Sequence, residues 1–475
     1  MRTGSQKYEN ALVGQGPGNT LQLHFLYTFT LGNEPFATGR DEIRRRMGPA
    51  FTTRGSFPAR DSSADFHDSL EGGFRPFLNV RRDHLLVTSH YTLPGTGGSV
   101  HFSPGRGWSL PAQNFSRFSA IIRVLDTGIG SVRFVLEFND ADLFRLSTRG
   151  LIELADLSPS IAASDLRCEE HPEIDVLGGR IRLNELFRLE VETLARALGT
   201  TWIDVCGIPG PVIVNPPLIA TDTYDYQCPF VISLIRGYVP RKASLAALAR
   251  PVNHGQSLHE ATLCKQIAGL LVRLRDWEQI NERYAEKNVD AFDSIFPSRE
   301  VYLNIHARSA LCISEASAAP ASHVFDLGDV LIESVVDTIE LLRTRWHGLI
   351  ISSFVLSETM KDVYRLVTDP QRPVGWLTAP AEWTKLVTRI ILTQRHCSEL
   401  LENAVSYRRA AGAFIELYER GMERFGITEL ADEVTGKLKS LDRVYDYAFE
   451  LQRLGSVAEL RSKRLLGVPD VAPDS

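Results

Sequence analysis

Acidic side chains, together with a cysteine and a histidine, are the groups in this chain best suited to holding a divalent cation. Carboxylate oxygens are the ligands that magnesium and manganese prefer, and thiolate or imidazole groups add softer ligands. Two alternative metal sites are predicted: one formed by Asp140, Asp142, Asp222 and Asp225, the other by the segment 168–175 with Cys168 and His171. Asp140 and Asp142 also suit the opening turn of a helix, and the segment around Cys168 also suits an acidic surface loop. These alternatives stay open.

A second candidate site is a concentration of arginines in and just after a long polar segment, residues 34–76. Guanidinium groups pair bidentately with phosphate or carboxylate groups, so the cluster predicts an anionic small ligand or an acidic partner. Its members are Arg44, Arg45, Arg46, Arg75, Arg81 and Arg82. Interspersed acids such as Asp41, Glu42 and Asp83 partly neutralise the cluster, and a mixed-charge loop without a ligand is the alternative interpretation.

The usual signatures of nucleotide and hydrolase sites are missing from the sequence. No segment matches GxxxxGK[ST], GxSxG or HExxH, and the glycine-rich stretch 14–18 precedes the first predicted strand. Ser257 and Glu260 instead match a helix capping box. The motifs therefore identify no cofactor, and they leave open whether the protein is an enzyme.

Composition is that of an ordinary globular protein. Of 475 residues, 44% are hydrophobic and 23% charged, and 52 basic against 58 acidic side chains give a net charge of −6, which disfavours nucleic-acid binding. Six scattered cysteines form no CxxC pair and fit a reducing cytoplasm. The first 20 residues lack the apolar core of a signal peptide, and the run at 348–356 is too short for a bilayer. We expect a soluble cytoplasmic protein that contacts no membrane.

The elements expected before residue 140 are strands. Alternating apolar residues predict a strand at 20–31 with one face well buried. Glycine-rich connections at 94–98 and 126–130 predict two hairpins, formed by 85–92 with 99–102 and by 118–125 with 132–138.

Between residues 180 and 320 the pattern mixes helices and strands. It predicts helices at 183–198 and 258–277 and apolar strands at 230–239 and 301–313 that could be central in a sheet. Residues 1–320 are therefore expected to form a mixed α+β or α/β module.

From residue 321 to residue 466 the chain is predicted to form a bundle of long antiparallel helices. Apolar residues keep helical spacing through three segments, near 330–367, 383–421 and 430–454. Single apolar stripes on helices of this length require a covering surface, which favours a homo-oligomer or a protein partner. Residues 467–475 are expected to be a disordered tail.

The passage from the strand at 301–313 into the helix opened by 326–333 carries a family resemblance. This layout, over the second half of the chain, resembles the soluble domain of CorA-type magnesium channels. The family's Gly-Met-Asn motif and its two membrane spans are missing here. The nearest sequence to the motif, Gly421-Met422-Glu423, lies in a polar helix end and does not replace it. The resemblance therefore implies a shared scaffold without transport.

Two functional hypotheses follow from the sequence. The first is a non-catalytic oligomer whose helical module mediates self-association or partner binding and whose mixed module senses a ligand. The second is a divalent-metal-dependent hydrolase or transferase that uses the aspartate clusters of the mixed module.

Overall fold

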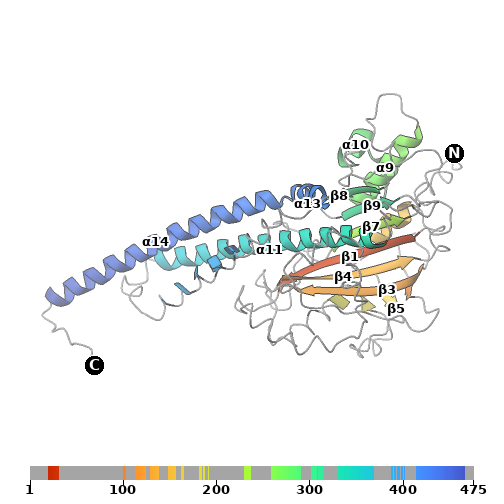
Figure 1. Cartoon of the computed structure of the whole chain (residues 1–475). Helices are drawn as coiled ribbons and strands as arrows, with labels where there is room; N and C mark the ends of the chain where they lie inside the picture. The colour runs from red at the N-terminus through yellow and green to blue at the C-terminus, as the bar shows by residue number, and fades with distance from the viewer. Residues whose placement is uncertain are drawn as a thin grey trace. The chain divides into compact units, whose positions relative to one another are not determined.

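The structure is a computed structural model of the whole chain (Figure 1). The residues it describes are 20–30, 100–102, 113–124, 129–138, 148–156, 162–164, 181–183, 186–187, 191, 229–236, 258–289, 301–306, 309–314, 329–368, 384, 387–388, 390–391, 393–395, 397–398, 401 and 413–465.

The described strands form one mixed sheet in the order β6-β5-β2-β3-β4-β1-β7-β9-β8. Their bounds are β1 Thr20–Thr30, β2 Val100–Phe102, β3 Gln113–Val124, β4 Ile129–Phe138, β5 Ala162–Ser164, β6 Ile181–Arg182, β7 Phe230–Arg236, β8 Val301–Ile305 and β9 Ser309–Ser314. β7 pairs with β9 in parallel, and the other described pairs are antiparallel. Together with the helices that follow, this sheet confirms the α+β class.

Strand β1 lies inside the sheet, paired with β4 on one side and β7 on the other. The strand was predicted correctly, but the expectation of one well-buried face was too narrow, because His24, Thr28 and Thr30 on the other face are also buried. The first part of α11 covers the face with the even-numbered residues, and Phe187 packs on the other face, where it stacks on Tyr27 at 4.5 Å.

β3 and β4 form the predicted antiparallel hairpin, with Ile122 opposite Val132. Gly130 begins the returning strand, and a Cβ there would lie 2.6 Å from the carbonyl oxygen of Arg123. Glycine is therefore required at this position by the close approach of the neighbouring strand.

The segment predicted as a single strand at 301–313 is two strands, so that prediction was wrong. β8 and β9 pair antiparallel, with Leu303 opposite Cys312, and the His306 N–H donates to the Ser309 carbonyl at 2.8 Å. The chain therefore reverses direction between β8 and β9, where the sequence has no glycine or proline that would predict a turn.

Helix α9 runs over Leu258–Val272 and ends five residues before its predicted limit. Arg273 takes a positive φ of 58°, and the Leu274 N–H donates to the Gly269 carbonyl at 2.9 Å, which is the Schellman end of a helix. Short elements lie elsewhere: α5 Thr148–Asp156, η5 Trp277–Gln279 and α10 Glu282–Val289.

The first and third of the predicted long helices are present, and the second, predicted at 383–421, is described only in part. The described parts are α11 Asp329–Thr368, α13 Ala413–Arg424 and α14 Ile427–Leu465, and the described residues between 384 and 401 are helical. Gly426, with a φ of 62°, ends α13 and leads into α14.

The chain divides into two compact units. The sheet unit contains the described residues up to His347 together with residues 413–426, and the helical unit contains α11 from Gly348, the helical residues between 384 and 401, and α14. This division passes through α11, whereas the predicted border at 320/321 precedes that helix.

In the helical unit, the second part of α11 and α14 lie side by side (Figure 1). Ser353 donates to Glu433 at 2.8 Å, and Lys437 donates to the same serine hydroxyl at 2.7 Å. Gln394 donates to Asp442, which places the intervening helical segment along α14 as well.

Several predicted segments lie outside the described residues. They are the polar segment 34–76, the strand at 85–92 and the tail at 467–475; of the helix at 183–198, the four described residues, 183, 186, 187 and 191, are helical.

Candidate functional site

A polar seam lies between the sheet and the first part of α11. On the sheet side it uses residues of β1, β3 and β4 that the strand register places on one face. On the helix side it uses Asp337, Glu340, Thr344 and His347, whose spacing of three, four and three residues forms one stripe of an α-helix. The seam is therefore a contact of two polar surfaces inside the protein.

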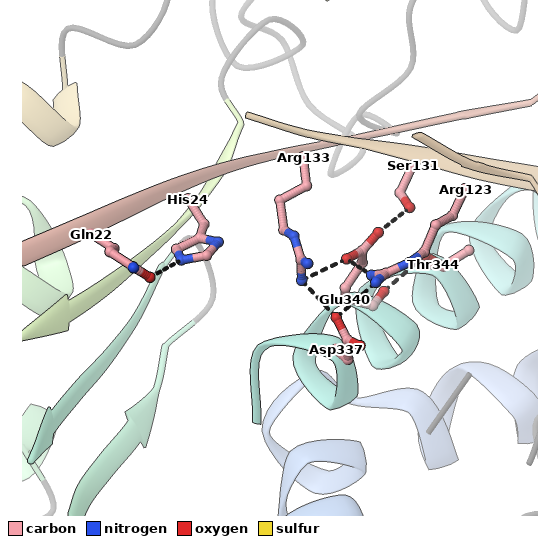
Figure 2. A network of polar contacts seen from close by, with 8 residues as sticks. All are labelled: Gln22, His24, Arg123, Ser131, Arg133, Asp337, Glu340 and Thr344. Carbon is pink, nitrogen blue, oxygen red and sulfur yellow. Dashed lines mark hydrogen bonds and ion pairs between the residues drawn. The ribbon is translucent and has the colours of Figure 1, made fainter. Parts of the chain in front are cut away.

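Four charged side chains form the centre of this seam (Figure 2). Arg133 contacts Asp337 at 2.8 Å and Glu340 at 3.0 Å. Arg123 contacts Asp337 at 2.9 Å and also pairs with Glu340, and Ser131 donates to Glu340 at 2.5 Å. Each arginine therefore contacts both acids, and the two positive and two negative charges balance.

Burial and ion pairing shift the pKa values of these groups in opposite directions. Burial by itself raises the pKa of Asp337, but the neighbouring Arg123 and Arg133 outweigh it and hold that pKa below its usual value. Burial would likewise lower the pKa of Arg123, but Asp337 and Glu340 raise it above its usual value. The side chain of Glu340 is fully buried, so removing the arginines or the acids of this cluster would leave the opposite charge uncompensated inside the protein.

His24 lies beside this cluster on β1 (Figure 2). Its Nε2 is 3.3 Å from the Gln22 side-chain oxygen, and Gln22 in turn donates to Glu137 at 3.4 Å. Burial and the charge of Arg133 hold the pKa of His24 well below its usual value. The ring is therefore neutral at physiological pH and is a poor proton acceptor there.

His347 joins the same helix to β1 farther along the seam. Its Nδ1 is 2.9 Å from the Thr28 hydroxyl, and its Nε2 is 2.8 Å from the Thr30 hydroxyl. Burial, together with the charge of Arg343, lowers the pKa of His347 to about 3. A neutral imidazole has one donor and one acceptor nitrogen, so both threonines can bond to it without an added proton.

The arrangement is suited to holding the helix on the sheet. General base catalysis needs a carboxylate or imidazole that can accept a proton near neutral pH. In the part of the seam that the structure describes, the acids already accept hydrogen bonds from arginine or serine, and both imidazoles are held neutral. The geometry therefore fits an internal ionic clamp.

The described cysteines are also poor nucleophiles. Cys264, Cys312 and Cys397 are free and buried. Burial raises the pKa of the Cys312 thiol to about 12, and it raises that of Cys397 to about 12 despite the opposing hydrogen bond with Ser352. Neither of these two thiols ionises near neutral pH.

The residues predicted to bind ligand or metal lie outside the described residues. This holds for the arginines Arg44, Arg45, Arg46, Arg75, Arg81 and Arg82, and for the metal candidates Asp140, Asp142, Asp222, Asp225, Cys168 and His171. Within the described ranges no group of three histidine, cysteine or acidic side chains is arranged to hold a metal ion.

The seam was missed by the sequence interpretation, although a signal for it is present. The sequence predicted one well-buried face for the strand at 20–31 and an apolar stripe for the first long helix, and it predicted no contact between polar residues of the two. The polar stripe formed by Asp337, Glu340, Thr344 and His347 has the same helical period. Opposite charges on the two elements, at Arg133 and Glu340, are what make them complementary.

Comparison with known proteins adds no further assignment. No family model matches the chain, and neither a curated protein nor a solved structure shows significant similarity to it. Among the described helices, none has a stretch long and apolar enough to span a membrane.

Proposed function

We propose that this protein is a non-catalytic oligomer that associates with a second copy of itself through the distal half of α14. The observation that carries the proposal is the exposure of two large apolar side chains on one face: Tyr447 is 56% exposed and Leu454 59%. Phe449, 47% exposed, lies on the other side of the helix, where it stacks on Tyr445. Exposed apolar groups gathered in one place are typical of association surfaces.

The two halves of α14 differ in what they bury. Val434, Leu441 and Val444 are buried, whereas no described side chain of α14 after Val444 is buried. Tyr447 and Leu454 are seven residues apart and lie on one face of the helix. Among the side chains of α14 whose burial the structure describes, the buried ones therefore lie in its first half.

Charge along α14 favours a second copy in antiparallel orientation. The first turns carry Glu429, Asp432 and Glu433, and the last turns carry Arg461, Lys463 and Arg464. If two copies cross near Tyr447, each acidic end lies beside the basic end of the other. Such complementarity orients association and weakens with added salt.

Sedimentation of the full chain tests this surface. Replacing both Tyr447→Glu and Leu454→Glu is expected to produce monomer at concentrations where the wild type associates, because buried charge opposes the contact. The matched control is Tyr284→Glu, which alters a tyrosine 47% exposed in the sheet unit and is expected to leave the mass unchanged. Association that survives the double substitution would contradict the proposed surface.

A cysteine placed at the crossing point tests the orientation. In the antiparallel arrangement Tyr447 lies opposite itself, so Tyr447→Cys is expected to form a disulfide-linked dimer under mild oxidation. Gly436→Cys is the control, because position 436 of one copy is then about 30 Å from position 436 of the other. Cross-linking of both variants to equal extents would argue against this orientation.

The mixed module would add ligand sensing through its predicted arginine cluster, and the CorA-like layout would supply a scaffold without transport. The alternative is a metal-dependent hydrolase or transferase. It predicts that magnesium, manganese or zinc raises the thermal stability of the protein and that alanine at Asp140 or Asp222 removes the effect.

A further inference from the structure

Arg343 of α11 is a buried cation surrounded by aromatic rings. Its side chain is 8% exposed, and the guanidinium carbon lies 3.7 Å from the centre of the Trp346 ring. The rings of Phe230 and Phe425 are 5.4 Å and 6.0 Å away. Such contacts attract the flat face of the guanidinium group and steady its position.

One donor on the hydrogen-bonding edge of Arg343 is buried and unsatisfied. The five N–H donors of a guanidinium group point outward in its plane, away from a stacked ring. The Nε of Arg343 has no hydrogen-bond acceptor, and among the described residues no carboxylate lies within ion-pair distance of this group. A buried donor without an acceptor is unusual in native proteins.

A second guanidinium group lies near Arg343, because it bonds to the residue next to Phe230, whose ring Arg343 contacts. Arg273 comes from the end of α9 and donates from an Nη to the Pro229 carbonyl at 2.9 Å, beside the start of β7. Burial, together with the charge of Arg273, lowers the pKa of Arg343 to about 9. Arg343 is buried and Arg273 is partly buried, and a bound anion would lower the repulsion between these two like charges.

The backbone at Arg273 supports a role for its side chain. Its φ of 58° is a left-handed conformation that glycine usually supplies at the end of a helix. An arginine here bears a conformational cost that glycine would avoid. Unusual backbone geometry of this kind is found where a side chain has a specific task.

We propose that Arg343 and Arg273 form a binding site for the oxyanion group, phosphate or carboxylate, of a small ligand. Trp346 would hold the guanidinium plane of Arg343, so that its N–H edge faces the ligand oxygens. Arg273 would supply the second positive charge. This site belongs wholly to the sheet unit and is separate from the α14 surface.

Titration with inorganic phosphate and with acetate, each against sodium chloride of equal ionic strength, tests the proposal in the full chain. We expect a saturable rise in melting temperature with at least one of the two anions and none with chloride. Phosphate alone would assign the site to a phosphate group, and acetate alone to a carboxylate. An equal response to all three salts would overturn the proposal.

Three variants locate the binding. Arg343→Met keeps the aliphatic bulk and is expected to abolish the anion response, and Arg273→Gly is expected to weaken affinity at least tenfold. The glycine variant relieves the positive φ, so it should fold even if the methionine variant does not. Arg453→Gln removes an exposed charge in the helical unit and should bind like the wild type. Unchanged affinity in Arg273→Gly would overturn the proposal.

Discussion

The seam under α11 and the distal half of α14 differ in which side chains they bury and which they expose. In the seam, charged and polar side chains are buried but matched, as Arg133 is with Asp337 and Glu340. In distal α14, the apolar side chains Tyr447 and Leu454 are exposed to solvent. Both helices have long amphipathic sequences, so the difference lies in what each one faces.

The comparison distinguishes a surface whose partners lie within the chain from one whose partner must be another molecule. Buried charge is tolerated only with partners, and the seam supplies those partners within the chain. Removing apolar area from water stabilises a protein, and the described side chains of Tyr447 and Leu454 are not covered in this way within the chain. The first surface is therefore expected to be intramolecular and the second intermolecular.

The largest expected effect comes from breaking the seam. Glu340→Ala leaves Arg123 and Arg133 with less compensation inside the protein and should lower the free energy of unfolding by about 3–5 kcal/mol. Glu433→Ala removes an acid whose ion pair with Lys437 is at the surface of α14, and it should cost about 1 kcal/mol or less. Chemical denaturation of the two variants measures both values. Equal losses would contradict the contrast between the two regions.

Alanine substitutions at two helical glycines should also destabilise the sheet unit more than the helical unit, with smaller effects on stability than the glutamate substitutions. A Cβ on Gly421 of α13 would collide with Leu342 of α11, so Gly421→Ala should cost about 1–3 kcal/mol. Gly436 of α14 has no atom within 4 Å of its added Cβ, so Gly436→Ala should stabilise by about 1 kcal/mol. Thermal unfolding distinguishes a fall in melting temperature from a rise. A rise in both variants would show that the α11–α13 contact is loose.

Acidification should weaken the seam through His347. Its folded-state pKa of about 3 lies below the unfolded value, so the unfolded chain binds more protons and stability falls as pH drops from about 6.5 toward 3. Between pH 6.5 and pH 5.5 the loss from this residue is about 1 kcal/mol. His24, whose pKa is also lowered, contributes with the same sign.

A matched variant separates His347 from the other groups that titrate. His347→Gln is expected to be less stable at pH 7, because it loses contacts with Thr28 and Thr30, but to show a shallower dependence on pH. The slope of unfolding free energy against pH is the decisive readout. A slope as steep as that of the wild type would exclude His347 as the source.

Much of the fold could be predicted because its signals are local. Alternation identified β1, the glycine-rich turn identified the β3–β4 hairpin, and helical spacing identified α11 and α14. The reversal between β8 and β9 was missed because nothing in the residue types around His306 requires a turn. That reversal is fixed by pairing between strands, which a local pattern does not contain.

The sites were harder to predict because they depend on contacts between distant segments. Glu340 contacts Arg123 and Ser131 across more than 200 residues of sequence, and Arg343 contacts Phe230 and Phe425, which are also far from it in the sequence. The arginines and aspartates predicted as ligand and metal sites are instead close to one another along the sequence. The α11 stripe was visible as a period, but its partners on the sheet were not.

The native mass of the purified full chain, measured over a range of protein concentrations, tests self-association most directly. The account predicts a mass that rises with concentration toward twice the 53.0 kDa subunit and falls when salt is added. A mass of one subunit at every concentration, with Tyr447 and Leu454 unaltered, would contradict it.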